Sequence, residues 1–180
     1  MTARWRWPGA RVPCAAIVHR FLQTTAFLFL SCLTACGTNG SSSQPGSAPA
    51  ADPVAAMDAA IAALMARPEL PDQSIKLQHI LIAFRGAPRI TGVTRSLAEA
   101  RTLAAEVFAR VQKGEDFDAL MKQYSNDGGP GIYPMTKAGR REMVPGFGSV
   151  GFRLKPGQIG VAPHDTSNSP YGWHIIKRLE

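Results

Sequence analysis

Two histidines lie in the middle of apolar segments, where a polar side chain is unusual. They occur as Gln78-His79-Ile80-Leu81 and as Trp173-His174-Ile175-Ile176. A single histidine in such a place is more often a core residue with one hydrogen bond. Two in matching contexts instead indicate a shared polar site, because imidazole can donate or accept a proton and can bind a metal near neutral pH.

Metal binding and thiol chemistry are the other possibilities for these residues. A metal site could combine His79 and His174 with His164 and Asp165, but these residues lack the helical spacing of an HExxH-type motif, which speaks against it. The cysteines are Cys14, Cys32 and Cys36. The sequence from Gly37 onward therefore has no thiol for a disulfide, a thiolate metal site or a nucleophile.

Both histidines are expected to lie on strands. Residues 74–84 are rich in β-branched and large apolar residues, and the period of two places Ile75, Leu77, His79 and Leu81 on one inward face. The last strand is expected over residues 172–179, with a shorter one over 158–162. We interpret residues 125–142, which are rich in Gly and basic residues and have no period, as a long loop.

Helices are expected between these strands and ahead of them. Ser96 and Glu99 have capping-box spacing at the start of a helix that Gly114 closes, and Asp116 caps a shorter helix over 117–124. A helical turn is expected near 144–152, and an Ala-rich helix begins at the N-cap Asp52 and stops at Pro68. Its apolar stripe comprises Met57, Ile61, Leu64 and Met65. The order of elements predicts an α+β fold, with a small antiparallel sheet of about four strands flanked by helices.

From His79 to Arg178 the sequence resembles the parvulin-type peptidyl-prolyl cis/trans isomerases. The resemblance rests on short motifs in the family's order: His79-Ile80-Leu81-Ile82, Thr94-Arg95-Ser96, Gly114-Glu115-Asp116-Phe117, Tyr124-Ser125-Asn126-Asp127, residues 143–147, residues 152–159 and Gly172-Trp173-His174-Ile175-Ile176. It implies the parvulin fold, which is related to that of the FKBP proteins.

The resemblance implies catalytic roles for four polar residues. His79 and His174 match the family's paired histidines, which lie on neighbouring central strands at the floor of the site and would be linked through hydroxyl groups. Asp127 follows the Tyr-Ser-Asn motif at a position that holds Cys or Asp. Ser169 matches a hydroxyl residue that supports the second histidine. Asp rather than Cys at 127 argues against covalent catalysis.

The resemblance also implies a pocket for the proline ring. Met143 and Phe147 match residues that line it, and Phe152 is a further candidate. The family's Gly-Gly-Asp-Leu-Gly segment, whose Leu joins the pocket, is replaced here by residues 128–135, GGPGIYPM. We expect Met135 or Ile132 to take the place of that Leu. Arg85 and Arg89 are interpreted as solvated surface, so no preference for phosphorylated substrates is predicted.

The function implied is isomerisation of X-Pro bonds in proline-containing unfolded or exported polypeptides. Rotation about an amide bond needs an apolar grip on the proline ring and a site that favours the twisted amide, but neither a nucleophile nor a cofactor. The alternative is a catalytically inactive module that keeps the parvulin fold and binds exported polypeptides as a chaperone.

The first 36 residues have the features of an export signal. A basic stretch precedes the apolar segment 21–33, which is shorter than the ~20 residues of a membrane span. Leu33-Thr34-Ala35-Cys36 resembles the lipobox of bacterial lipoproteins, so Cys36 is expected to carry lipid. The alternatives are a plain signal peptide and an uncleaved anchor in which Cys36 is incidental.

We therefore expect four segments: a signal peptide over 1–35, the lipidated Cys and a flexible tether over 36–53, an Ala-rich helix and connection over 54–72, and the isomerase domain over 73–180. The tether consists almost wholly of small and polar residues, which cannot bury enough surface to fold. A periplasm-facing anchor in the cell envelope follows. The outer membrane is favoured, because Gly37 is not the Asp that retains lipoproteins at the inner membrane in some bacteria.

The basic character of the chain belongs largely to the expected signal peptide. The net charge is +7, from 20 Lys and Arg against 13 Asp and Glu, and residues 1–35 hold four Arg and no acidic residue. Without those four Arg, 16 basic and 13 acidic residues leave a net charge of +3. The basic and aromatic stripe of nucleic-acid-binding proteins is also absent, so no nucleic acid partner is expected. The expected partners are polypeptides and, through the lipid anchor, a membrane, and the protein is expected to be a monomer.

Overall fold

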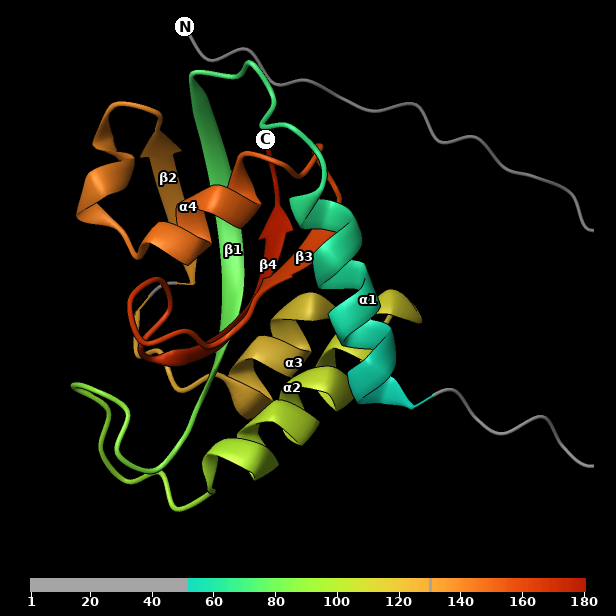
Figure 1. The fold of residues 1–180 in the computed structure, drawn as a ribbon, viewed down its shortest axis with the longest axis vertical. Coiled ribbons are helices and arrows are strands. Elements are labelled where there is room, and N and C mark those ends of the chain that lie inside the picture. The colour runs from blue at the N-terminus through green and yellow to red at the C-terminus, as the bar shows by residue number, and fades with distance from the viewer. Residues whose placement is uncertain (1–51, 130) are drawn as a thin grey trace, which may run out of the picture. The chain divides into compact units, whose positions relative to one another are not determined.

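The computed structural model describes residues 52–129 and 131–180, so the expected signal peptide, Cys36 and residues 37–51 of the expected tether lie outside the described residues (Figure 1). The last two residues assigned to the tether belong to the folded domain, because Asp52 caps the first helix and Pro53 begins it. Four strands form one antiparallel sheet in the order β2-β1-β4-β3. Their bounds are β1 Ser74–Ala83, β2 Ile132–Thr136, β3 Ile159–Ala162 and β4 Gly172–Arg178. The α+β fold with a four-stranded antiparallel sheet is therefore confirmed.

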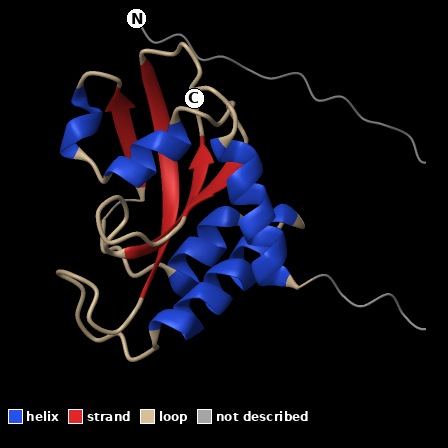
Figure 2. Ribbon diagram, in the orientation of Figure 1, coloured by secondary structure: helices blue, strands red, loops and turns tan. Residues whose placement is uncertain are grey.

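Helices cover both faces of the sheet (Figures 1 and 2). On one face α2 (Leu97–Gln112) and α3 (Phe117–Tyr124) form a core with Ile80, Ile82 and Ile175. On the other face α4 (Pro145–Gly151) packs with Leu77 and Ile176, and a short 3-10 helix, η1 (Gly139–Glu142), precedes it. The central strands are thus buried on both sides.

Local signals fixed the helix ends where the sequence indicated. Ser96 and Glu99 form the full capping box of α2, and Gly114, at φ +88°, follows its end. The Asp116 carboxylate accepts a hydrogen bond from the backbone N–H of Ala119 at the start of α3. These bonds satisfy N–H groups that the first turn of a helix leaves without a partner.

Two expectations about the strands were wrong. In β1 the apolar alternation suggested one buried face, but every residue from Leu77 to Ala83 is buried, because β1 is central and helices lie on both faces. The expected loop 125–142 contains β2, whose pairing with β1 matches Leu77 with Tyr133. Pro134 in the middle of β2 concealed the strand in the sequence, and it is tolerated because β2 is an edge strand.

The first helix, α1 (Pro53–Met65), belongs to the core of the domain. It packs against α2 and β3, and the side chains of Met57 and Leu64 are 0% and 6% exposed. Met65, which the sequence placed in the same apolar stripe, is exposed. In the described residues no helix has the length and apolar character needed to cross a membrane.

Residues 67–73, which we call the strap, connect α1 to β1 and lie against α4 and η1. The backbone N–H of Leu70 donates to the carbonyl of Phe152 at 2.7 Å, and Arg153 Nε donates to the carbonyl of Arg67 at 2.9 Å. Glu69 accepts hydrogen bonds from both Arg140 and Arg153. These contacts tie η1 and the C-terminal end of α4 to the strap.

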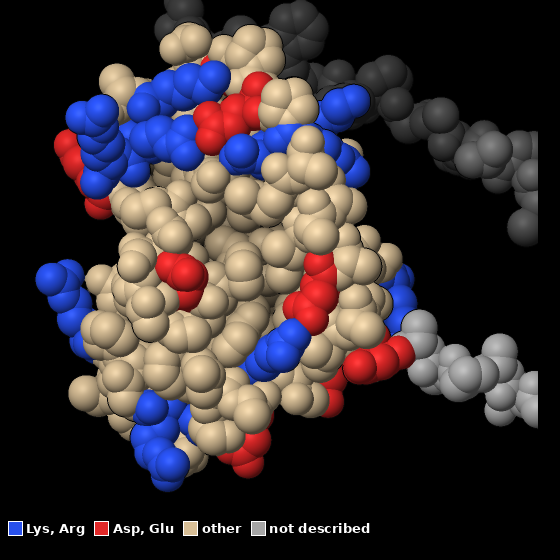
Figure 3. Space-filling model, in the orientation of Figure 1, with Lys and Arg blue, Asp and Glu red and all other residues tan. Residues whose placement is uncertain are grey.

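Charge is unevenly spread over the face seen in Figure 3. Lys and Arg side chains gather at its upper end with acidic side chains among them, while the middle of the face is mostly uncharged. The described residues contain seven ion pairs, six with Lys or Arg and one between His79 and Asp127. Six Lys and Arg side chains of this domain therefore face an acidic partner.

Candidate active site

The two histidines lie side by side on the face of the sheet that α4 covers. Leu81 pairs with His174 and His79 pairs with Ile176 in the register of β1 and β4, so the two rings are diagonal neighbours on one face. Their Nδ1 atoms are 3.1 Å apart and the rings are stacked at 10°. Both residues are buried. The antiparallel register thus creates the pair.

The segment after α3 runs along β1 and positions Asp127. Ser125 Oγ accepts from the backbone N–H of Leu81, the Asn126 side chain accepts from that of Ala83, and the N–H of Asn126 donates to the carbonyl of Leu81 at 2.8 Å. These three bonds explain the Ser125 and Asn126 positions of the Tyr-Ser-Asn motif. They bring Asp127 Oδ2 to 2.7 Å from His79 Nε2.

The electrostatics of this cluster favour an ionised Asp127. The hydrogen bond from His79, supported by those from the Tyr133 hydroxyl and the Gly129 N–H, holds the pKa of Asp127 well below its usual range despite partial burial. Burial, followed by the bond to Asp127, raises the pKa of Tyr133 to about 12. Burial lowers the pKa of His174 to about 3, helped by the neighbouring His79.

These charges determine where the protons lie when both rings are neutral. A carboxylate only accepts, so His79 Nε2 carries the proton donated to Asp127. His79 Nδ1 is then an acceptor, and His174 Nδ1 must donate to it. His174 Nε2 is left as a buried lone pair without a hydrogen-bond partner among the described residues. The cluster is therefore a directed chain from His174 through His79 to Asp127.

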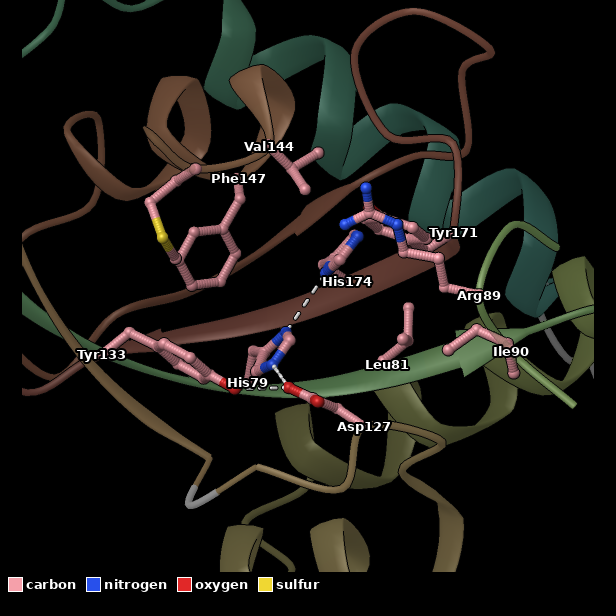
Figure 4. Close-up of a pocket in the computed structure, with 11 residues that line it drawn as sticks. His79, Leu81, Arg89, Ile90, Asp127, Tyr133, Val144, Phe147, Tyr171 and His174 are labelled. Atoms are coloured by element: carbon pink, nitrogen blue, oxygen red, sulfur yellow. Dashed lines mark hydrogen bonds and ion pairs between the residues drawn. The ribbon is translucent and has the colours of Figure 1, made fainter. Parts of the chain in front are cut away.

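A cavity of about 230 Å³ opens above this chain (Figure 4). Its lining combines the polar chain with aliphatic and aromatic side chains: His79, Leu81, Arg89, Ile90, Asp127, Tyr133, Met143, Val144, Phe147, Tyr171 and His174. The Phe147 ring stands edge-on to His79 at 5.1 Å between centroids and to His174 at 5.9 Å. The volume is below the ~300–1,000 Å³ of pockets for drug-sized ligands, so it suits one side chain of a peptide.

Met143 and Phe147 line the cavity as expected, but Phe152 and Met135 do not. Phe152 is fully buried in the core beneath α4, with Arg140 and Lys137 over its ring. Met135, also buried, packs in that same core from β2. Ile132, the other expected replacement for the family's Leu, is exposed. Alternation along β2 points Tyr133 to the cavity instead.

Ser169 does not support His174 in the expected way. Its hydroxyl is buried and has no hydrogen-bond partner among the described residues. It lies against Gly146 at the start of α4, where an added Cβ would come within 2.3 Å of Ser169 Oγ. The expected link between the rings through hydroxyl groups is also replaced by the direct Nδ1–Nδ1 contact.

Other polar candidates lie apart from the histidine pair. His164, considered above as a metal ligand, has Nδ1 3.0 Å from the carbonyl of Ser169 and its ring against Phe84 and Trp173. In residues 52–129 and 131–180 no group of three His, Cys, Asp or Glu side chains is arranged to hold a metal ion.

Sequence reasoning missed several residues of the cavity. Tyr133 was hidden in the expected loop, and Arg89 and Ile90 belong to the connection after β1, which has no period. Arg89, interpreted as surface, lies at the cavity in the left-handed region, with φ at 58°. Tyr171 directly precedes β4, and its position three residues before His174 was the available signal.

Comparisons with known proteins agree with this geometry. A family model described as the PPIC-type PPIase domain, where PPIase stands for peptidyl-prolyl cis/trans isomerase, matches residues 60–180. Over 107 residues the chain is 31% identical to the chaperone SurA of Pseudomonas fluorescens, covering 58% of this chain and 22% of SurA. Over 78 residues it is 40% identical to the foldase protein PrsA of a Geobacillus species, covering 41% of this chain and 26% of PrsA.

Among solved structures, the chain is similar to peptidyl-prolyl isomerase ESS1 from Candida albicans. The TM-score is 0.52 at 19% identity, over 68% of this chain and 74% of that one. This likeness concerns the fold. The curated relatives are much longer than the region that matches. This chain spans about a quarter of their length.

Proposed function

Because the chain belongs to the PPIC-type peptidyl-prolyl cis/trans isomerase family, with a parvulin-type domain, we propose that it accelerates the cis/trans isomerisation of X-Pro bonds in polypeptides. One observation carries the proposal. An apolar cavity walled by Met143 and Phe147 lies directly over the hydrogen-bonded series of Asp127, His79 and His174.

The chemistry requires only that the twisted amide be favoured over the planar one. Resonance places a barrier of ~18–20 kcal/mol on rotation about the C–N bond, and the planar form carries extra negative charge on the carbonyl oxygen. As the bond twists, that charge returns towards nitrogen. A site that binds the twisted form better than the planar form therefore lowers the barrier without covalent chemistry.

The residues of the site suit these demands in different ways. Phe147, Met143 and Val144 offer an apolar surface to the proline ring, and an apolar surround disfavours the charge-separated planar amide. Asp127, whose side chain is 30% exposed, lies where it can face the carbonyl of the preceding residue. Its negative charge repels the carbonyl oxygen more in the planar than in the twisted form. His79 and His174 hold that charge in place.

The test is the rate of cis-to-trans exchange in short X-Pro peptides, measured by exchange NMR with the full chain. We expect acceleration by the wild type, and a loss of about tenfold or more in kcat/KM for Asp127→Asn, which keeps the shape and removes the charge. Phe147→Leu is expected mainly to raise KM. Asp58→Asn, which removes an exposed carboxylate of α1 paired with Arg101, is the matched control and should retain the wild-type rate.

The outcomes separate the enzyme from the alternative. No acceleration at high protein concentration would leave a binding module with the parvulin fold. Acceleration that is equal in the wild type and in Asp127→Asn would refute the role given to the carboxylate but not the activity.

We further propose that the protein acts on exported polypeptides in the cell envelope, as a folding helper tethered through lipid at Cys36. The support is the sequence of residues 1–53, together with the similarity to proteins described as a chaperone and a foldase. Incorporation of a labelled fatty acid tests the anchor. Label retained by Cys36→Ala would exclude that cysteine as the lipidation site.

A further inference from the structure

Tyr133 stands at a place where the chain departs from the parvulin pattern. The segment GGPGIYPM replaces the family's usual Gly-Gly-Asp-Leu-Gly, and Tyr133 is the residue that β2 turns towards the cavity. Its hydroxyl donates to Asp127 Oδ2 at 2.5 Å, the oxygen that also accepts from His79 Nε2 at 2.7 Å (Figure 4). One carboxylate oxygen thus joins β1, β2 and the segment after α3.

The ring of Tyr133 is part of the cavity wall as well. It meets His79 edge-on, with centroids 5.1 Å apart at 87°, and Phe147 at 6.0 Å and 82°. These T-shaped contacts fix the ring between the polar floor and the apolar wall. Residues 131 and 133 are anchored to β1 through the carbonyl of Gly131, which accepts from the N–H of His79, and through the pairing of Tyr133 with Leu77.

Gly129 supplies an independent sign that this contact is built into the chain. A Cβ at Gly129 would lie 2.5 Å from the Tyr133 hydroxyl oxygen and 3.5 Å from Asp127 Oδ1. The backbone N–H of Gly129 donates to that Oδ1 at 3.2 Å. The glycine therefore leaves room for the tyrosine hydroxyl while it holds the other carboxylate oxygen.

We propose that Tyr133 is a positioning residue of the isomerase site, which fixes the Asp127 carboxylate in the orientation that binds His79 and closes the β2 side of the proline pocket. The proposal rests on the proposed isomerase function and adds a residue to its machinery. The raised pKa of Tyr133 keeps the hydroxyl protonated, and so able to donate, across the physiological range.

Two substitutions separate the hydroxyl from the ring. Tyr133→Phe keeps the ring and its contacts with His79 and Phe147, so we expect KM within about twofold of the wild type. With one hydrogen bond to a charged group removed, kcat should fall about tenfold. Tyr133→Leu removes the hydroxyl and shortens the wall, so it should lower kcat similarly and also raise KM.

Tyr124→Phe is the matched control. The Tyr124 hydroxyl also bonds a charged side chain, accepting from Arg110 Nη1 at 2.6 Å, but it lies outside the cavity. Its loss should leave kcat and KM unchanged. Circular dichroism melts of all three variants would show whether the fold is retained.

NMR of the histidine ring nitrogens provides a readout that a wall residue alone would not move. We expect the His79 Nε2–H signal to be sharp and protected from exchange in the wild type, and broadened in Tyr133→Phe because Asp127 is less well held. Unchanged kcat and an unchanged signal in Tyr133→Phe would overturn the proposal. A rise in KM alone would also overturn it, because Tyr133 would then be wall only. The ring-nitrogen signals report on Asp127 and His79 even if the wild type does not accelerate exchange, so failure of the isomerase function remains distinguishable.

Discussion

We predict that Glu69, in the strap, holds the elements that carry Met143 and Phe147 in place. Glu69 is 26% exposed and accepts hydrogen bonds from Arg140 Nη1 at 2.9 and 2.8 Å and from Arg153 Nη1 at 3.2 Å. Arg140 lies in η1, three residues before Met143, and Arg153 follows α4, which carries Phe147. Glu69→Gln removes the charge that joins them and leaves two guanidinium groups facing a neutral amide.

The size of the effect follows from these bonds. Hydrogen bonds to charged groups contribute about 1.5–3 kcal/mol when buried, but partial exposure reduces ion pairs to about 0–1 kcal/mol at the surface. For a carboxylate one-quarter exposed, with two partners, we expect Glu69→Gln to lower the free energy of unfolding by about 1–2 kcal/mol. This corresponds to about 3–8 °C in Tm for a domain of this size.

The measurement is urea unfolding at pH 7, with peptide exchange assayed in parallel. We expect KM to rise a few-fold with little change in kcat, because the wall bearing Met143 and Phe147 loosens while Asp127 and His79 are untouched. Glu115→Gln is the control, since it removes an exposed carboxylate paired with Arg110 and should leave stability and KM unchanged.

The same variant has a pH signature. The hydrogen bond from Arg140 holds the pKa of Glu69 below its ordinary value of 4.5. The stability that Glu69 contributes is therefore present above pH 4.5 and is lost as the pH falls through the lowered pKa of the folded state. The difference between wild type and Glu69→Gln should vanish in acid. Equal unfolding of the two proteins at pH 7 would refute this role of Glu69.

Three further predictions concern α1, β4 and His174. Met57→Ala should cost about 2–5 kcal/mol in chemical unfolding, because this side chain of α1 is fully buried in the core; a cost near zero would mean that α1 is not part of the folded domain. Gly172→Ala should fail to fold or melt far below the wild type, since φ is +141° and the new Cβ would lie 2.2 Å from the carbonyl oxygen of Ile82; a thermal melt like that of the wild type would contradict this backbone geometry. Because burial lowers the pKa of His174 to about 3 from 6.5, the unfolded chain binds the extra proton, and the free energy of unfolding should fall as the pH drops from about 6.5 towards 3. Unfolding measured between pH 6.5 and 5 should lose this slope in His174→Gln, and an unchanged slope would assign it to another group.

Most of the fold could be predicted from local signals. The capping box at Ser96, the N-caps Asp52 and Asp116 and the glycine at 114 each act within one turn of a helix, so the sequence contains all of the information that sets those ends. The strand β2 could not be found in this way, because an edge strand of five residues containing a proline depends on its pairing with β1 rather than on its own pattern.

The residues of the site also differ in how far the sequence alone predicted them. Motifs in the sequence pointed to His79, Asp127, Met143 and Phe147, and the structure brings these residues together around one cavity. Tyr133, Arg89 and Tyr171 reach that cavity only through the register of β2 and the course of two connections. Phe152 and Met135 show the converse, since an apolar residue next to a motif cannot be assigned to the pocket or to the core until the packing of α4 is known.

The two edges of the sheet bear on how such a protein could handle unfolded chains. An open edge offers a row of unpaired backbone groups on which another extended chain can assemble. Here Pro134 removes an N–H donor from the middle of β2, and α1 packs against β3 at the opposite edge. A polypeptide with exposed strands therefore has little backbone template to extend. The sheet therefore resists adding a further strand from another chain at either edge.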